Sequence, residues 1–311
     1  MKQYSPDSAR AALLLTNRLV PLDVKPLTAR EFWSLTERVD PGDLLHDDRV
    51  AITERLHVDE DQADRLRTLL DASTALGFEQ ERLLDGGVSL ISAFDDGFPS
   101  ALRQRLGATC PPFLLVGGPI DWLDRPGLGV VGSREASDEA LDAARRSAAM
   151  AVGEGWPVVS GLARGVDQVA MVGALDAGGV VVGVPAEGIL KVSRNAEIRR
   201  RVHDGQLCIA SPFAPNAPFQ AGNAMARNKI VYALSKVTFV VASDLGSGGT
   251  WAGATEALEH RYGAVAVWDG AGSKDGNRAL IARGATAISD LRQLFELEFE
   301  TGAPPLQDTL F

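Results

Sequence analysis

The sequence predicts an α/β protein: an extended Rossmann-like parallel sheet with helices on both faces, preceded by a small all-helical N-terminal domain. From residue 127 onward, short apolar strands alternate with helices, which is typical of parallel sheets with right-handed crossovers. Residues before about 84 show only helical spacing, and the 32 glycines suit many tight strand-to-helix turns. A length of 311 residues fits a helical domain at 1–84, a Rossmann domain at 85–300 and a flexible tail at 301–311.

The N-terminal part contains three expected helices. Apolar residues recur at helical spacing around Ala11–Leu15, and a second helix begins after Thr28. Thr28 and Glu31 have the spacing of a capping box just before an apolar run. A third helix is expected over Asp61–Leu76, with its leucines facing inward.

The character of the sequence changes at Gly86, where strands begin. Strands are expected at Val88–Ser92, Phe113–Gly117, Gly129–Val131, Val158–Ser160, Val180–Val184, Leu207–Ala210, Val237–Ala242 and Ala264–Trp268. Helices are expected at Phe98–Leu106, Asp138–Gly153, Asp167–Ala177, Ala226–Ser235, Thr250–Arg261 and Asp290–Phe299. The near-continuous Val, Ile and Ala content of the strands fits burial on both faces of the sheet.

The net charge of −10 is unevenly distributed. Residues 186–240 hold 8 Lys and Arg against 3 acids, and residues 205–240 contain no acid at all. A localised site for phosphate is therefore compatible with an acidic body, although solvated helix faces explain part of the basic charge.

Other function classes find little support in the composition. Cys110 and Cys208 have apolar neighbours and are expected to be buried thiols rather than a disulfide or reactive pair. The four histidines are scattered, so neither a metal cluster nor a catalytic triad is expected, and we expect no cofactor. No apolar run approaches a membrane span, and we expect a cytoplasmic protein.

The first phosphate-binding candidate follows the strand Gly129–Val131. The formal G-x-G-x-x-G pattern at 127–132 is misleading, because the strand lies inside the pattern and NAD binding is not expected. The turn itself is Gly132-Ser133-Arg134. The glycine permits the backbone to come close to a phosphate, and the Arg134 guanidinium is suited to donating two hydrogen bonds to it. The helix that follows this turn begins with free N–H groups, which favour an anion. The alternative is that a side chain caps this helix and that Arg134 forms an ion pair on the surface.

Three further glycine-containing turns are expected at the same edge of the sheet. Ser160-Gly161 and Arg164 follow the second Rossmann strand, and Asp167 is expected to cap the next helix. Asn223, Arg227 and Lys229 enter a helix, and at least one of the two cations is expected to face a cleft or solvent. Gly248, Gly249 and Thr250 form the fourth turn, which is also suited to an anion.

These motifs, in this order and spacing, resemble the DprA/Smf DNA-processing family over about residues 86–290. The most specific block is Ser160-Gly-Leu-Ala-Arg-Gly-Val-Asp167. The resemblance implies single-stranded DNA binding without catalysis, a role in DNA uptake, recombination or defence, a homodimer, and transfer of DNA to a RecA-type recombinase. It also implies that the DNA cleft is lined by Arg134, Arg164, Asn223, Arg227 and Lys229.

The sequence departs from the family pattern at several positions. Met171 replaces a usual histidine, and the stretch Asn223–Lys229 has lost one arginine and an aromatic residue. We expect no winged-helix domain after the core, in contrast to some members. These departures leave the DNA affinity and the recombinase role open.

Two other functions compete for the same cleft. Gly248-Gly249-Thr250 and Glu256 resemble, with stretched spacing, the motif of LOG-type nucleotide phosphoribohydrolases, in which a glutamate assists cleavage between base and ribose. A SLOG-type nucleotide-sensing module is the second alternative. In addition, Gln307, Leu310 and Phe311 resemble the pentapeptide that binds the bacterial sliding clamp, against the alternative of a frayed or self-docked C-terminus.

The DNA-binding hypothesis predicts affinity that comes mainly from Arg and Lys and falls steeply with salt. Phe213, Phe219 and Trp251 are candidates for base stacking, although each is as readily a core residue. Arg134→Ala and Arg227→Ala are each expected to weaken strand binding without changing thermal stability.

Overall fold

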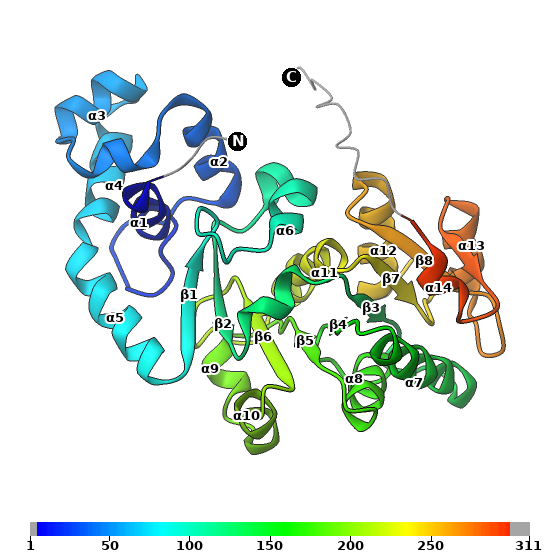
Figure 1. The fold of residues 1–311 in the computed structure, drawn as a ribbon. Helices are drawn as coiled ribbons and strands as arrows, with labels where there is room; N and C mark the ends of the chain where they lie inside the picture. Colours follow the sequence, from blue (N-terminus) through cyan, green and yellow to red (C-terminus); the bar gives the residue numbers. More distant parts are fainter. Residues whose placement is uncertain (1–4, 299–311) are drawn as a thin grey trace.

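The computed structural model describes residues 5–298. A nine-stranded sheet forms the centre, with α7, α8, α9 and α10 on one face and α6, α11 and α12 on the other (Figure 1). The N-terminal helices lie beside the β1–β2 end of this sheet. Within this range, no helix combines the length and the apolar character that crossing a lipid bilayer requires.

The N-terminal part is helical, as expected. Its helices are α1 (Pro6–Leu15), α2 (Ala29–Arg38), α3 (Arg49–Leu56), α4 (Glu60–Asp71) and α5 (Ser73–Asp85), with a 3-10 turn at Pro41–Leu45. The capping box is confirmed, because Thr28 Oγ1 accepts from Glu31 N at 3.2 Å and Glu31 Oε2 accepts from Thr28 N at 2.7 Å. The single helix expected over Asp61–Leu76 is wrong. Ala72 leaves helical geometry, and the resulting bend lets Leu70 and Leu76 both enter the core.

The sheet has the order β1-β2-β6-β5-β4-β3-β7-β8-β9. Strands β3 to β9 pair in parallel, whereas β1 pairs with β2 and β2 with β6 in antiparallel fashion, so the sheet is mostly rather than wholly parallel. The strands are β1 (Val88–Ser92), β2 (Phe113–Gly117), β3 (Leu128–Val131), β4 (Val158–Ser160), β5 (Val181–Gly183), β6 (Leu207–Ser211), β7 (Val237–Val240), β8 (Ala264–Trp268) and β9 (Thr286–Ile288).

Most of the connecting helices that the sequence predicts lie close to their expected positions. The helix expected from Ala226 begins at Ala221, however, and the helices at Ile189–Val192, Ala196–His203 and Asp275–Ala282 are additional to those expected. The connecting helices are α6 (Ser100–Leu106), α7 (Asp138–Gly153), α8 (Val166–Asp176), α9 (Ile189–Val192), α10 (Ala196–His203), α11 (Ala221–Leu234), α12 (Gly248–His260), α13 (Asp275–Ala282) and α14 (Gln293–Glu296), with 3-10 turns at Gly107–Thr109 and Ile120–Asp124. Helix α14 is shorter than expected, since Gln293 Oε1 accepts from the backbone N–H groups of Ser289 and Asp290 and closes a turn there.

The strand order creates a switch point beside β3. From β3 the chain adds β4, β5 and β6 on one side, and it then returns to add β7, β8 and β9 on the other. The connections leaving β3 and β7 therefore diverge at their carboxyl ends and leave a crevice, which is where open α/β sheets bind ligands.

One hydrophobic cluster spans the helical part and the sheet. Trp33 of α2 donates from Nε1 to the carbonyl oxygen of Cys110 at 2.7 Å, which ties the two parts together. Both cysteines are free and buried, as expected, and burial raises the pKa of each thiol to about 12. The domain division at residue 84 stays a prediction.

Candidate functional site

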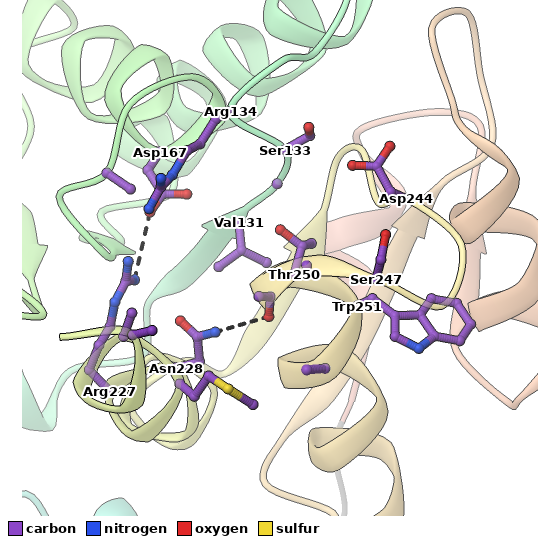
Figure 2. A pocket seen from close by; sticks show the side chains of 18 of the residues that line it. Val131, Ser133, Arg134, Asp167, Arg227, Asn228, Asp244, Ser247, Thr250 and Trp251 are labelled. Atoms are coloured by element: carbon purple, nitrogen blue, oxygen red, sulfur yellow. Dashed lines mark hydrogen bonds and ion pairs between the residues drawn. The ribbon is translucent and has the colours of Figure 1, made fainter.

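A cavity of about 780 Å³ opens at the switch point. One wall is the turn after β3, Gly132–Glu135, and the opposite wall is the loop before α12, from Gly246 to the start of the helix. The start of α11 closes the remaining side. Figure 2 shows Arg134, Asp167 and Arg227 on one side, and Asp244, Ser247 and Trp251 on the other.

The start of α12 is open toward this cavity. Its N-cap residue Ser247 makes no side-chain cap hydrogen bond, and no acid occupies its first turn. The predicted residues Gly248, Gly249 and Thr250 all line the cavity. Asn228 holds the loop by donating from Nδ2 to the carbonyl oxygen of Gly249 at 3.0 Å (Figure 2). Unsatisfied N–H groups at a helix start attract anions.

The start of α11 is open in the same way. Its N-cap residue Gln220 makes no side-chain cap hydrogen bond, and its first turn also lacks an acid. Ala221, Ala224 and Met225 from its first two turns line the cavity. Two uncapped helix starts therefore face the same space, and both favour negative charge.

The helix starts after the other two predicted turns carry acidic side chains in their first turns. Ser137 Oγ accepts from Ala140 N at 3.3 Å, and Asp138 and Glu139 follow in the first turn of α7. The first turn of α8 contains Asp167, which is buried. An anion is therefore less favoured at the starts of α7 and α8 than at those of α11 and α12, because α7 is capped by Ser137 and both α7 and α8 begin with acidic residues.

The turn after β3 presents Arg134 to the cavity. Arg134 is exposed and makes no hydrogen bond or ion pair within residues 5–298, so the ion-pair alternative is not observed there. Gly132 allows a close approach to α8: a Cβ there would lie 2.6 Å from Val166 Cγ2, so only glycine lets the turn pack this closely. Its expected approach to a phosphate stays a prediction. Arg134 is the cation in this wall that is free to meet a ligand.

Ser133 is held by a residue that the sequence did not indicate. Lys274, the N-cap residue of α13, donates from Nζ to Ser133 Oγ at 3.2 Å and to Asp244 Oδ1 at 2.8 Å. This contact links the two walls at the rim of the cavity. Lys274 lies 141 positions from Ser133, and no local motif marks it.

Arg227 lines the cavity but is buried, with 7% of its surface exposed. Its Nη1 lies 3.7 Å from Asp167 Oδ2, and Asp167 also accepts from the backbone N–H of Gly161 at 3.1 Å. Burial raises the pKa of Asp167 against the opposing effect of Arg227, and burial lowers the pKa of Arg227. The helix-cap role expected for Asp167 is wrong, because α8 has no side-chain cap.

Gly161 and Ser160 are structural parts of this arrangement. A Cβ on Gly161 would lie 1.2 Å from Arg227 Nη1, so the missing side chain is what lets the guanidinium lie across the loop. Ser160 is buried and donates from Oγ to the carbonyl oxygen of Val130 at 2.8 Å. Neither residue lines the cavity.

The remaining predicted residues lie outside the main cavity. Arg164 is exposed but does not line it. Asn223 and Lys229 line a second cavity of about 260 Å³ on another side of α11. Lys229 Nζ contacts Glu256 Oε1 at 3.1 Å, so these two side chains satisfy each other. Helix α11 therefore divides its polar residues between two cavities.

Two exposed apolar side chains stand at the main cavity. Phe219 and Met225 are 55% and 53% exposed, and both line it. Trp251 lines it too, with the guanidinium of Arg283 over its ring at 5.0 Å. Phe213 is buried and lines the second cavity. Phe219 and Trp251 are thus the stacking candidates that the structure brings to the site.

The side chains around the main cavity are not strongly basic. Arg134 and Arg227 are balanced by Glu135, Asp167 and Asp244. The groups that favour an anion here are Arg134 and the two open helix starts, rather than a cluster of cations. The expectation that Arg and Lys side chains supply most of the affinity stays a prediction.

Comparisons with known proteins agree with the architecture. The family model described as DNA recombination-mediator protein A matches residues 89–298. Protein Smf of Escherichia coli is 31% identical over 212 residues, which cover 67% of this chain and 56% of that protein. DNA processing protein DprA of Streptococcus pneumoniae is 28% identical over 213 residues, which cover 67% of this chain and 74% of that protein. The match to Protein Smf thus spans little more than half of that relative's length.

Solved structures show the same fold. DprA of Streptococcus pneumoniae superposes with a TM-score of 0.63 at 20% identity, covering 88% of this chain and 99% of that chain. DNA processing protein A of Helicobacter pylori, whose structure concerns its single-stranded DNA binding mode, gives a TM-score of 0.57 at 21% identity, covering 67% of this chain and 94% of that chain. The family match extends over more than half of the sequence. The chain belongs to the DNA recombination-mediator protein A family.

Proposed function

We propose that this chain binds single-stranded DNA in the switch-point cavity and acts in DNA uptake or recombination without catalysing a reaction. The observation that carries the proposal is the convergence on one cavity of two uncapped, acid-free helix starts and Arg134, which has no hydrogen bond or ion pair among residues 5–298. Phosphate groups fit such a site, because backbone N–H groups and an arginine fork both donate to anionic oxygens. Phe219 and Trp251 offer flat surfaces to unpaired bases.

Family membership supports the proposal. The Helicobacter pylori relative is described by its single-stranded DNA binding mode, and the family is described as a recombination mediator. An unpaired strand suits the cavity better than a duplex, because base stacking on exposed aromatic rings needs unstacked bases.

Nucleotide hydrolysis would need the glutamate of its motif at the main cavity, and Glu256 does not lie there. Glu256 contacts Lys229 Nζ and the hydroxyl of Tyr262, at 3.1 Å and 3.2 Å. A catalytic acid or base must lie within hydrogen-bond reach of the group it serves. The nucleotide-sensing alternative would use the same cavity, and competition by free nucleotides distinguishes it.

Arg134→Ala is expected to weaken binding of a fluorescent oligothymidylate about tenfold, since it removes a charged donor worth about 1.5 kcal/mol or more. The slope of log affinity against log salt should fall by about 0.7, the value for one contact to single-stranded DNA. The melting temperature should not change, because Arg134 is exposed and has no partner within residues 5–298. Fluorescence polarisation at several salt concentrations measures both quantities.

Arg38→Ala is the matched control, because Arg38 is exposed and lines neither cavity. If the parent and Arg134→Ala bind the strand equally well, the main cavity is not part of the DNA-binding site. Displacement of the strand by AMP or cyclic nucleotides would favour the sensing module, and release of adenine from AMP would favour the hydrolase.

We further propose a homodimer that acts in the cytoplasm and passes DNA to a RecA-type recombinase. The description of the family as a recombination mediator supports the last of these roles. The clamp-binding hypothesis concerns Gln307, Leu310 and Phe311, which lie outside the described residues. It stays a proposal based on the sequence alone.

A further inference from the structure

The second cavity lies between the N-terminal helical part and the sheet. It is lined from the N-terminal side by Thr16, Arg18, Leu27 and Ala29, and from α11 by Asn223, Ala226, Lys229 and Ile230. Phe113, Phe213 and three prolines form much of the rest. Two of its lining residues are cations and none is an acid, which distinguishes it from the main cavity.

Arg18 is presented to this cavity by a fixed turn. Asn17 Oδ1 accepts from the backbone N–H groups of Leu19 and Val20, at 2.6 Å and 3.1 Å, so the turn after α1 is held in place. Arg18 itself is exposed and makes no hydrogen bond or ion pair within the described part of the chain. A long cation that the fold positions without giving it a partner is available to a ligand.

Across the cavity, Asn223 adds a neutral donor. Its side-chain amide also has no hydrogen-bond partner between residues 5 and 298. Lys229 differs, because Glu256 compensates its charge at 3.1 Å. Arg18 and Asn223 therefore make the polar pair that is free to bind, and both suit phosphate oxygens.

The first turns of α11 contribute residues to both cavities and so lie between them. Ala224 and Met225 line the main cavity, whereas Asn223 and Ala226 line the second. Ala221, Gly222 and Ala226 are exposed, and a Cβ on Gly222 would meet nothing within 4 Å. Because Ala221, Gly222 and Ala226 are small, they leave room for a single strand to pass close to the open start of α11.

We propose that a single strand bound in the main cavity continues over the start of α11 into the second cavity, where Arg18 and Asn223 bind its phosphates. This inference rests on the proposed function. It gives the N-terminal helical part a direct role in DNA binding, and it makes the site longer than the main cavity alone. The apolar side chains of Phe213 and the prolines face the sugar and base portions of the strand.

The test compares oligothymidylates of about 4 and about 16 nucleotides, the span of site sizes known for single-strand-binding folds. Arg18→Ala should weaken binding of the longer strand about five- to tenfold and leave the shorter strand unaffected, because only the longer one reaches the second cavity. Arg18→Glu should enlarge the loss. Arg134→Ala should weaken both lengths, and the control Arg38→Ala should weaken neither.

The outcomes separate this inference from the proposed function. If the parent binds both lengths and Arg18→Ala and Arg18→Glu also bind both normally, the strand does not enter the second cavity and the inference is wrong. An equal loss for short and long strands also contradicts it, because Arg18 would then act at the main cavity. Failure of the parent to bind either strand would overturn the proposed function and this inference with it.

Discussion

A Ser247→Asp variant is expected to bind single-stranded DNA roughly 10- to 100-fold more weakly while becoming about 1 kcal/mol more stable. Ser247 holds the N-cap position of α12 in extended geometry, yet its side chain caps nothing. Aspartate is among the best N-cap residues, so its carboxylate would accept from the free N–H groups and stabilise the helix. The same carboxylate would occupy the position proposed for a phosphate and repel the strand.

Thermal unfolding and fluorescence polarisation on the same preparation measure the two effects. Ser137→Asp is the matched control, because it adds the same charge at the N-cap of α7, which is already capped and does not line the cavity. This control should bind like the parent. A Ser247→Asp variant that keeps full affinity would show that the start of α12 is not part of the DNA site.

Arg227→Ala is expected to lower the free energy of unfolding by about 3–5 kcal/mol, the usual cost of breaking a buried ion pair from one side. Asp167 is only 4% exposed, and it would lose its cationic partner 3.7 Å away. The result differs from the expectation based on sequence, in which Arg227 contacts DNA from an exposed position and contributes nothing to stability. Urea unfolding followed by circular dichroism measures the loss.

The pH dependence of that loss identifies its cause. Burial already raises the pKa of Asp167, and removing Arg227 raises it further. A folded-state pKa above the unfolded value means that stability is fully present below the ordinary carboxyl pKa and is lost as pH rises through the folded pKa. The deficit of Arg227→Ala should therefore be largest near neutral pH and shrink on acidification.

A double variant provides the control for this second prediction. Arg227→Met with Asp167→Asn removes both charges and keeps an acceptor for the Gly161 N–H, so it should recover much of the lost stability. A deficit that does not change with pH, or a double variant as unstable as Arg227→Ala, would point to lost packing rather than to an unpaired buried charge.

The sequence was sufficient to locate most of the sheet and the edge that carries the site. Strands such as Val158–Ser160 are short apolar runs between glycines and turns, and helix α7 begins and ends where its pattern indicates. Gly132, Arg134, Gly248 and Gly249 line the cavity because parallel strands bring their carboxyl ends to one edge. The three-residue β9 was missed, since two of its residues are exposed and give no apolar run.

Contacts between distant segments could not be predicted. Helical periodicity places Asn223 and Ala226 on one stripe of α11 and Ala224 and Asn228 on another, but it does not say which cavity each stripe meets. Whether a helix start is open depends on the orientation of its N-cap side chain: Ser137 caps α7 and Ser247 leaves α12 uncapped, although both are serines. Lys274 reaches Ser133 only because the loop between β8 and α13 comes close to the start of α7, where a Cβ on Gly272 would lie 2.4 Å from Ser137 Oγ.

The open starts of α11 and α12 have a consequence for how conditions affect the site. Peptide N–H groups have no acidic or basic form within the physiological range and no rotamers to freeze when a ligand arrives. If binding depends largely on these N–H groups, the affinity should change little between mildly acidic and mildly alkaline pH. Binding should also cost little side-chain conformational entropy. Because the proposed contacts come from the backbone, substitutions at neighbouring side chains should leave this part of the attraction intact, unless they add a cap or a negative charge at a helix start as Ser247→Asp does.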